Sequence, residues 1–143
     1  MNADVWRATP GGEERVKSAE PLFDDEVDVD ATRRFLLDER NALLIAYVDA
    51  VPAGFVSGTE LSHPDKPAPE MFLNELGVDE AYRGRGIGRL LVERLWSLAR
   101  ERGCREMWVL TDEENVAANK VYAAAGGARA GVEVMYEWRA SGG

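Results

Sequence analysis

The pattern of hydrophobic and polar positions changes period several times along the chain, and each change predicts an element. Between residues 86 and 102, apolar residues recur at spacings of three and four with charged residues between them, which predicts an amphipathic helix that ends at Gly103. The apolar run 42–48 and the similar segment 53–61 predict two strands. Residues 49–52 lie between these segments and predict the turn of an antiparallel hairpin.

The remaining segments complete an alternation of strands and helices. Further strands are predicted at Asp4–Thr9, Glu70–Val78, Glu106–Thr111 and Val132–Trp138, and further helices at Glu13–Ala19, Ala31–Glu39 and Val116–Ala125. Asp30 is the expected N-cap of the second of these helices. The stretch 62–69 contains three prolines, so we expect an irregular loop there with a solvated His63. Because no repeat or linker interrupts the pattern, we expect one α+β domain, an α/β/α sandwich with a mixed sheet, over residues 1–143.

The charge balance narrows the choice of partners. The 143 residues include 17 Lys and Arg against 26 Asp and Glu, a net charge of −9. A surface of this sign repels phosphate backbones, which argues against a nucleic-acid partner and leaves a cationic substrate open. The first ten residues have neither a basic segment nor an apolar one, so we expect no secretory signal, no membrane association and a cytoplasmic protein.

One cysteine and one histidine, Cys104 and His63, exclude an intrachain disulfide and a Cys/His metal site. Cys104 lies where the long helix gives way to a strand, which favours a packing role over that of a reactive thiol.

The segment with the clearest chemistry is the glycine-rich turn that opens the long helix, Arg83-Gly84-Arg85-Gly86-Ile87-Gly88. Glycines let the backbone approach a ligand closely, and the free N–H groups at a helix N-terminus bind a pyrophosphate. Seven of the fourteen arginines fall between residues 83 and 105. No Gly-Lys-Ser/Thr follows, and Arg89 stands at the third position of the dinucleotide fingerprint, so the turn matches neither an NTP-hydrolysing nor an NAD-binding motif.

Two motifs in order carry a resemblance to a known superfamily. Leu76-x-Val78 followed by the turn at residues 83–88, and then Asn115-x-x-Ala118-x-x-Val121-Tyr122-x-x-x-Gly126, resemble the Gcn5-related N-acetyltransferases (GNAT). The resemblance implies a central, mostly antiparallel sheet whose two parallel central strands splay apart, flanked by about four helices. It also implies acetyl-CoA as cosubstrate and no metal.

The same resemblance implies roles for individual residues. The residues expected to bind acetyl-CoA are Leu76, Val78, Arg83, Gly84, Arg85, Gly86, Ile87, Gly88, Asn115 and Ala118. The backbone N–H of Val78 would polarise the thioester carbonyl. Glu75 would accept the proton of the amine, and Tyr122 would return a proton to the CoA thiolate. Gly77, inside a regular strand, is consistent with a bulge at that point.

A finer resemblance links the chain to the type I aminoglycoside 3-N-acetyltransferases, although that family usually has Asp at the position of Glu75 and His at that of Tyr136. It implies a small polycationic amine as acceptor, bound by Asp25, Glu26, Asp28, Glu75, Asp112 and Tyr136. Two other hypotheses stay open. The acceptor could be a protein N-terminus, a lysine or a polyamine, or the chain could bind acetyl-CoA without catalysis. A homodimer is also open.

Overall fold

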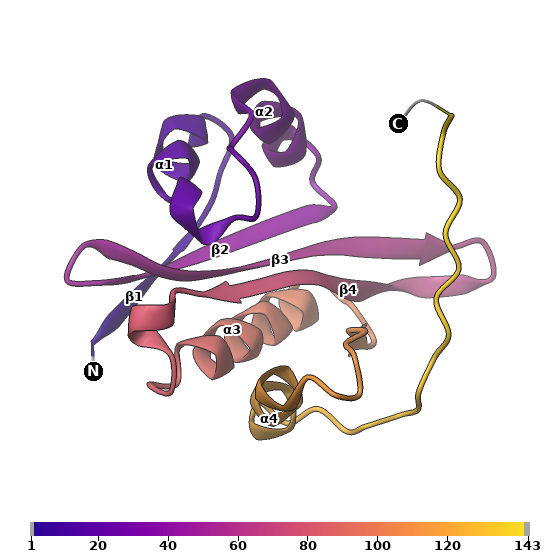
Figure 1. The fold of residues 1–143 in the computed structure, drawn as a ribbon. Coiled ribbons are helices and arrows are strands. Elements are labelled where there is room, and N and C mark those ends of the chain that lie inside the picture. Colours follow the sequence, from indigo (N-terminus) through magenta and orange to yellow (C-terminus); the bar gives the residue numbers. More distant parts are fainter. Residues whose placement is uncertain (1, 142–143) are drawn as a thin grey trace.

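The computed structural model describes residues 2–141 and has a five-stranded sheet at its centre, in the order β1-β2-β3-β4-β5 (Figure 1). The strands are β1 (Ala3–Arg7), β2 (Asn41–Val48), β3 (Val51–His63), β4 (Lys66–Val78) and β5 (Met107–Trp108). The first four pair antiparallel, whereas β5 is parallel to β4. The prediction of a mixed, mostly antiparallel sheet is therefore confirmed.

Helices cover both faces of this sheet and make three layers (Figure 1). One face carries α1 (Glu13–Ser18) and α2 (Val29–Leu37), and the other carries α3 (Ile87–Glu101) and α4 (Val116–Ala124). Two short 3₁₀ turns, η1 (Glu20–Leu22) and η2 (Glu80–Tyr82), precede α2 and α3. In residues 2–141 no helix has both the length and the apolar character that a membrane crossing demands.

Strand β2 shows how the sequence builds two cores at once. Seven of its eight residues are buried, and successive side chains point to opposite faces. Leu43 and Ile45 join the cluster under α1 and α2, whereas Leu44 packs with Leu91 under α3. The continuous apolar run in the sequence is thus a strand with both faces covered.

The predicted hairpin between β2 and β3 is confirmed, but its turn is shorter than the expected residues 49–52, because Val51 and Pro52 belong to β3. Asp49 and Ala50 both have positive φ, 50° and 65°, as a two-residue type I′ connection requires. For α2, the helix that precedes β2, the predicted start is wrong by two residues. Asp28, not Asp30, is the N-cap of α2, and its side chain accepts a hydrogen bond from the N–H of Ala31 at 2.7 Å. Asp30 instead pairs with Arg33 on the helix surface.

The proline-rich stretch at residues 62–69 is not a loop, contrary to expectation. Strands β3 and β4 continue through it, and His63 pairs with Lys66 across a tight turn. The register is irregular between this pair and Leu61–Glu70, and Pro67 and Pro69 fall within the irregular part, where their missing N–H groups break no regular ladder. His63 is accordingly a strand residue in contact with Glu70 rather than a solvated loop residue.

The end of the chain also differs from its prediction. The strand expected at residues 106–111 is reduced to Met107–Trp108, because β4 pairs with it only at Met71 and Phe72. The strand expected at residues 132–138 is an extended segment outside the sheet.

Glu70 fastens the short β5 to β4. Its carboxylate meets the Nε2 atom of His63 and accepts hydrogen bonds from Arg105 Nη2 and Trp108 Nε1, each at 3.2 Å. The hydrogen bond with His63, supported by that from Trp108, lowers the pKa of Glu70 below its ordinary value. The ring of Trp108 also lies 4.7 Å from that of Phe72, so the cluster reinforces the backbone hydrogen bonds that Met71 donates to Glu106 and Arg105 donates to Pro69.

We predict that Glu70→Gln lowers the Tm at pH 7 and that the difference from wild type closes in acid. Because the pKa of Glu70 is lower in the folded chain than in the unfolded one, where it is about 4.3, its contribution is complete above that value. It is lost as the pH falls through the folded pKa. Thermal melts from pH 7 to pH 3, with the exposed Glu39→Gln as control, measure this. A Tm difference that stays constant with pH would contradict the assignment.

A candidate active site on both faces of strand β4

The site begins where β4 and β5 separate. The two strands pair only at Met71–Met107 and Phe72–Trp108, and β4 then continues to Val78 with β3 as its partner. The N–H of Asp79 donates to the carbonyl of Ala53 in β3 at 2.8 Å. Since backbone groups alternate in direction along a strand, the N–H of Val78 points away from β3, into the gap between β4 and β5. This gap offers unpaired strand hydrogen bonds to an extended ligand.

A bulge in β4 determines which face each side chain reaches. Ser57 pairs with Glu75 but Gly58 pairs with Leu73, so Asn74 is an extra residue without an opposite partner. The extra residue reverses the alternation: Leu73 and Leu76 both pack towards α3, while Glu75 turns to the α1 and α2 face.

The expected bulge at Gly77 is therefore wrong, and Gly77 has a different physical role. It pairs regularly with Phe55 in β3. A Cβ at this position would lie 2.7 Å from Cε1 of Phe55, so only glycine lets the aromatic ring cross the strand here. The ring of Phe55 also contacts that of Phe23, with centroids 4.3 Å apart, beside the cavity described below.

The glycine turn lies at the end of β4 and opens α3. Gly84 and Gly86 have φ of 75° and 82°, a conformation that other residues rarely adopt. Gly86 is the N-cap of α3, and no side chain caps the helix. The first-turn N–H groups thus lack side-chain acceptors at the positive end of a 15-residue helix dipole, which suits an anionic ligand.

The three arginines of this region are used differently. Arg83 Nε donates to the carbonyl of Val78 at 3.3 Å, and Arg89 pairs with Glu93 at 2.9 Å. Arg85 lies over the ring of Tyr82, 5.6 Å from its centroid, and has no carboxylate partner within residues 2–141. Arg83 has no carboxylate partner in the described residues either, so Arg83 and Arg85 both carry charge that is free to meet an anion at the turn, whereas Arg89 is paired.

Helix α4 closes the same side of the sheet. A Cβ on Gly88 would lie 3.2 Å from Val121, so the glycine lets α4 approach the first turn of α3. The next residue, Tyr122, is half-buried against the core, and burial raises the pKa of its hydroxyl. Asn115 and Ala118 contact each other: Asn115 Oδ1 caps α4 by accepting from the N–H of Ala118 at 3.0 Å.

On the opposite face, a cavity of about 580 Å³ lies between the α1–α2 layer and the sheet. Acidic residues and aromatic walls line it together: Phe23, Asp24, Asp25, Glu26, Asp28, Phe35, Ser57 and Glu75 belong to its lining. Four residues expected to contact the acceptor, Asp25, Glu26, Asp28 and Glu75, therefore share one cavity. Asp28 also caps α2.

Two other expected acceptor residues do not line this cavity. Asp112 accepts a hydrogen bond from the N–H of Glu114 at 2.9 Å in an exposed turn. Tyr136 is 77% exposed on the extended tail.

Ser57 is a cavity residue that the sequence reasoning missed. Its hydroxyl is the one buried side-chain polar atom without a hydrogen-bond partner in the described part of the chain. A serine directly after the apolar residues 53–56, within the predicted strand, was the available signal.

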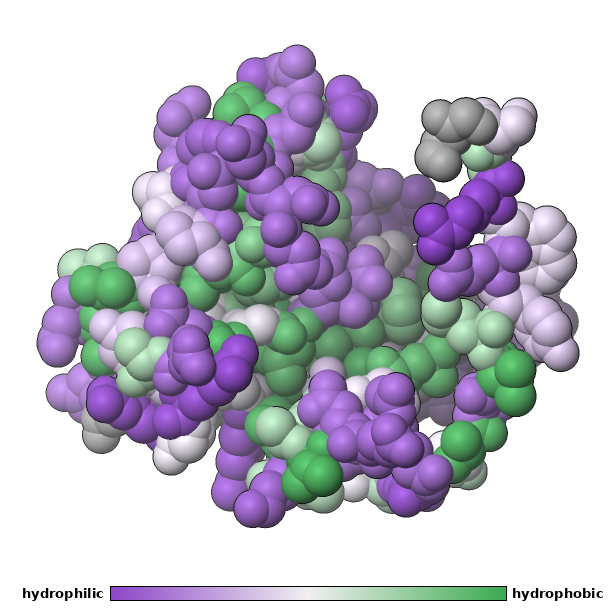
Figure 2. Space-filling view, in the orientation of Figure 1, coloured by the Kyte–Doolittle hydropathy of each residue, from purple (hydrophilic) through white to green (hydrophobic). Residues whose placement is uncertain are grey.

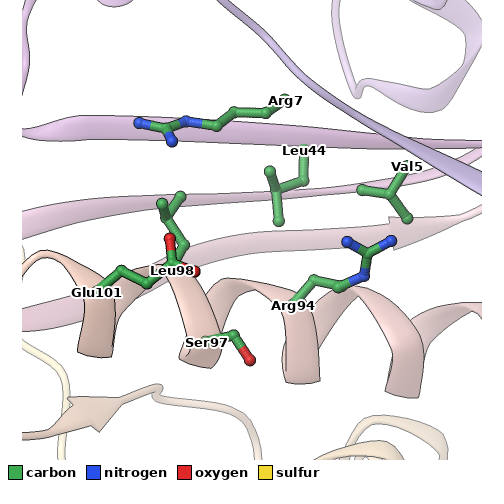
Figure 3. Close-up of a pocket in the computed structure, with 7 residues that line it drawn as sticks. All are labelled: Val5, Arg7, Leu44, Arg94, Ser97, Leu98 and Glu101. Carbon is green, nitrogen blue, oxygen red and sulfur yellow. The ribbon is translucent and has the colours of Figure 1, made fainter.

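A second, smaller cavity of about 170 Å³ lies between α3 and the β1–β2 edge of the sheet (Figure 3). Val5, Leu44 and Leu98 form its apolar walls, and Arg7 and Arg94 extend in opposite directions along it (Figure 3). Because the two guanidinium groups do not converge, this cavity lacks the arrangement of a binding site for an anion.

The whole arrangement matches a known family. The model of the acetyltransferase (GNAT) family matches residues 5–126, which include every element from β1 to α4 except the first residues of β1. The mycothiol acetyltransferase of Cellulomonas flavigena is 33% identical over 129 residues, 85% of this chain but 32% of that protein. The chain thus spans about a third of the length of these relatives.

Other similar proteins match this chain over most of their own length as well. The aminoglycoside N(6')-acetyltransferase type 1 of Salmonella typhimurium is 27% identical over 86% of this chain and 83% of its own length. Among solved structures, an aminoglycoside acetyltransferase from a soil metagenome, crystallised with sisomicin, superposes with a TM-score of 0.89 at 16% identity over 97% of each chain. That likeness confirms the fold. With its glycine turn, separated β4 and β5 and matching sequence model, the chain belongs to the acetyltransferase (GNAT) family.

Proposed function

We propose that this chain transfers an acetyl group from acetyl-CoA to a primary amine of a small polycationic acceptor, with an aminoglycoside as the leading candidate. The observation that carries the proposal is the placement of two oppositely charged sites on the two faces of β4. The helix N-terminus and Arg85 suit the pyrophosphate of CoA, and the acid-lined cavity suits a cationic amine. Glu75 and Val78 join the two sites, since they lie on the same strand.

In this proposal the pantetheine arm occupies the gap beside β4, where it hydrogen-bonds in the manner of an added strand. The N–H of Val78 points into that gap and stabilises the oxyanion that forms when the amine attacks the thioester. Leu76, Ile87 and the turn from Arg83 to Gly88 hold the cofactor. Asn115 and Ala118 contribute through the cap at the start of α4, where their hydrogen bond to each other leaves the side-chain nitrogen of Asn115 for the ligand.

Two side chains handle the protons. An amine arrives mostly as ammonium, and the Glu75 carboxylate in the cavity accepts its proton directly or through water before the nitrogen attacks the carbonyl carbon. When the tetrahedral intermediate collapses, the C–S bond breaks and Tyr122 protonates the departing thiolate; the second proton that the acylated nitrogen loses restores the Tyr122 hydroxyl through water. Burial raises the pKa of Tyr122, so the hydroxyl keeps its proton at neutral pH. Cys104 is buried in the core, and burial raises the pKa of its thiol, so we propose direct transfer without an acetyl-cysteine.

The relatives do not support the 3-N-acetylation that the finer sequence resemblance implies. The Salmonella relative is named for acetylation of the 6'-amine. A second candidate is the acceptor amine of a mycothiol acetyltransferase. The 33% identity to such an enzyme over 85% of this chain favours it. Thiol release from acetyl-CoA with aminoglycosides, polyamines and peptides, followed by NMR of the product, tests the acceptor. Activity with peptides alone would overturn the aminoglycoside proposal, and no release with any amine would support a non-catalytic module.

We predict that Glu75→Gln lowers kcat/KM for the amine by about 10²- to 10⁴-fold, the usual range for loss of a general base. Tyr122→Phe is expected to lower kcat by about 10²-fold, because it removes the general acid that protonates the thiolate. The matched control is Glu39→Gln, which makes the same chemical change at an exposed residue outside the cavity. Steady-state kinetics at saturating acetyl-CoA measure all three. Wild-type rates in both site variants would refute the proton-transfer roles.

We also predict that Gly86→Ala weakens CoA binding while Gly103→Ala does not. Both glycines have φ above 80° with open space around a Cβ, so each substitution costs the same backbone strain, about 1–3 kcal/mol. Only Gly86 lies at the N-terminus of α3; Gly103 follows its other end. Loss of one charge-assisted hydrogen bond raises Kd about tenfold or more. Calorimetric titration with CoA measures Kd, and equal effects of the two substitutions would contradict the turn as the pyrophosphate site.

A further inference from the structure

Most of the acids around the cavity lie in one short segment without regular structure. Residues 23–28 run between η1 and α2 (Figure 1), and they contain four of the five acids that line the cavity. Among the described residues, neither the backbone nor the side chains of residues 24–26 take part in a hydrogen bond or ion pair. Neighbouring carboxylates also repel one another. The position of these acids must therefore be determined by contacts at the ends of the segment.

Glu20 closes the segment at both ends. Its backbone carbonyl accepts a hydrogen bond from the N–H of Phe23 at 3.0 Å, and its carboxylate accepts one from the N–H of Val27 at 2.8 Å. These two bonds bring the first and the fifth residue of the segment to the same glutamate. Residues 24–26 thus form a loop whose base is Glu20.

Lys17 holds the other backbone group of Val27. Its Nζ atom donates to the Val27 carbonyl at 3.3 Å and pairs with the Glu20 carboxylate at 2.5 Å. The hydrogen bond between the two side chains raises the pKa of Lys17 and lowers that of Glu20, so both are charged at neutral pH. We call this ion pair, with its two bonds to Val27, the Lys17–Glu20 clamp.

Apolar contacts determine which way the clamped segment faces. Phe23 and Val27 are half-buried against the cluster under α1 and α2, and the ring of Phe23 lies 4.3 Å from that of Phe55. Residues 24–26, between them, are exposed and line the cavity. In Figure 2, hydrophilic residues cover the α1–α2 layer and hydrophobic residues show between it and α4. With both ends packed down, the segment presents its carboxylates to the cavity.

We propose that Lys17 and Glu20 are positioning residues for the acceptor, because their clamp holds the acids of residues 24–26 in the arrangement that binds a polycationic amine. The inference rests on the proposed function. A loop that is ordered before its ligand arrives loses less conformational entropy on binding, so it binds more tightly than a mobile loop with the same charges. Lys17 and Glu20 do not line the cavity, so they act through the segment that they hold.

Helix α2 carries an ion pair of the same spacing that offers a matched control. Asp30 and Arg33 pair at 2.8 Å and, like Lys17 and Glu20, are three residues apart. In the described chain neither of them forms a hydrogen bond with residues 23–28. Ion pairs at the surface contribute little to stability, so removal of one charge from either pair should leave the fold intact.

Lys17→Met separates the clamp from simple electrostatics, because the two predict opposite changes. Removal of a positive charge near the acids strengthens the negative potential and would by itself tighten the binding of a polycation. Loss of the clamp weakens it. We expect KM for the amine that wild type acetylates, and the Kd for sisomicin measured by calorimetry, to rise about tenfold. The kcat and the Kd for CoA should stay unchanged, and Lys17→Arg, which keeps the charge and the donors, should retain most of the affinity.

Two further measurements complete the test. Arg33→Met removes the same charge without touching the clamp, so its KM should equal the wild-type value or fall. Hydrogen exchange detects the clamp directly: the Val27 amide is expected to be protected in wild type and in Asp30→Ala, and to lose its protection in Glu20→Ala. Circular dichroism spectra of all variants should match that of wild type.

Three results would each overturn the proposal. They are a KM for Lys17→Met at or below the wild-type value, an equal rise of KM in Lys17→Met and Arg33→Met, and a Val27 amide that is unprotected in wild type. Failure of the proposed function looks different, since wild type itself would then release no thiol from acetyl-CoA with any amine, while its Val27 amide would still be protected.

Discussion

The feature on which the rest of the structure depends is the early end of pairing between β4 and β5. The cluster of Glu70 with His63, Arg105 and Trp108 fixes the two strands together at one end. Beyond Phe72 the strands share no further pairs, and the edge of β4 is left with unused hydrogen-bonding groups. A sheet that was paired along its full length would have no room for an extended ligand and no free N–H at Val78. The site is therefore a consequence of strand geometry before it is one of side-chain chemistry.

The candidate site depends, second, on the bulge at Asn74. By reversing the alternation it turns Glu75 to the α1–α2 face, while Leu76 and Val78 remain on the α3 face. Charge follows the same division. The arginine-rich turn and the helix N-terminus lie on the α3 side, and the acids of the segment between α1 and α2 lie around the cavity on the other side. The net charge of −9 is thus unevenly distributed, as an anionic cosubstrate and a cationic acceptor would require.

Local sequence patterns were enough to predict part of the fold. The three-and-four spacing of apolar residues gave α3 to within a residue at each end, and the apolar run of β2 was long enough to identify a strand. The fold class followed from two motifs in order. Features that depend on distant partners were not predictable. The length of β5 depends on where β4 leaves it, and the continuation of β4 through Pro67 and Pro69 depends on its pairing with β3. The tail has a good strand pattern from Val132 to Trp138, but no strand of the described residues pairs with it.

The residues of the candidate site were likewise predictable only in part. Glu75, Asp25 and Asp28 were expected near the acceptor and share one cavity, but the bulge that turns Glu75 into it has no signature at Asn74. Asp112 and Tyr136 were carried over from a resemblance, and neither lines that cavity. Ser57 was overlooked because a single serine in a strand is common, and only its burial without a partner distinguishes it.

The central claim is that CoA and the amine approach β4 from opposite faces and meet between Glu75 and Val78. Backbone amide NMR of the ¹⁵N-labelled chain, titrated separately with CoA and with sisomicin, tests it most directly. We expect CoA to shift amides from residues 76–88 and the start of α4, and sisomicin to shift those of residues 23–28 and Ser57, with only residues 75–78 responding to both. Two ligands that shift the same set of amides, or a CoA response that spares the turn at residues 83–88, would contradict the account.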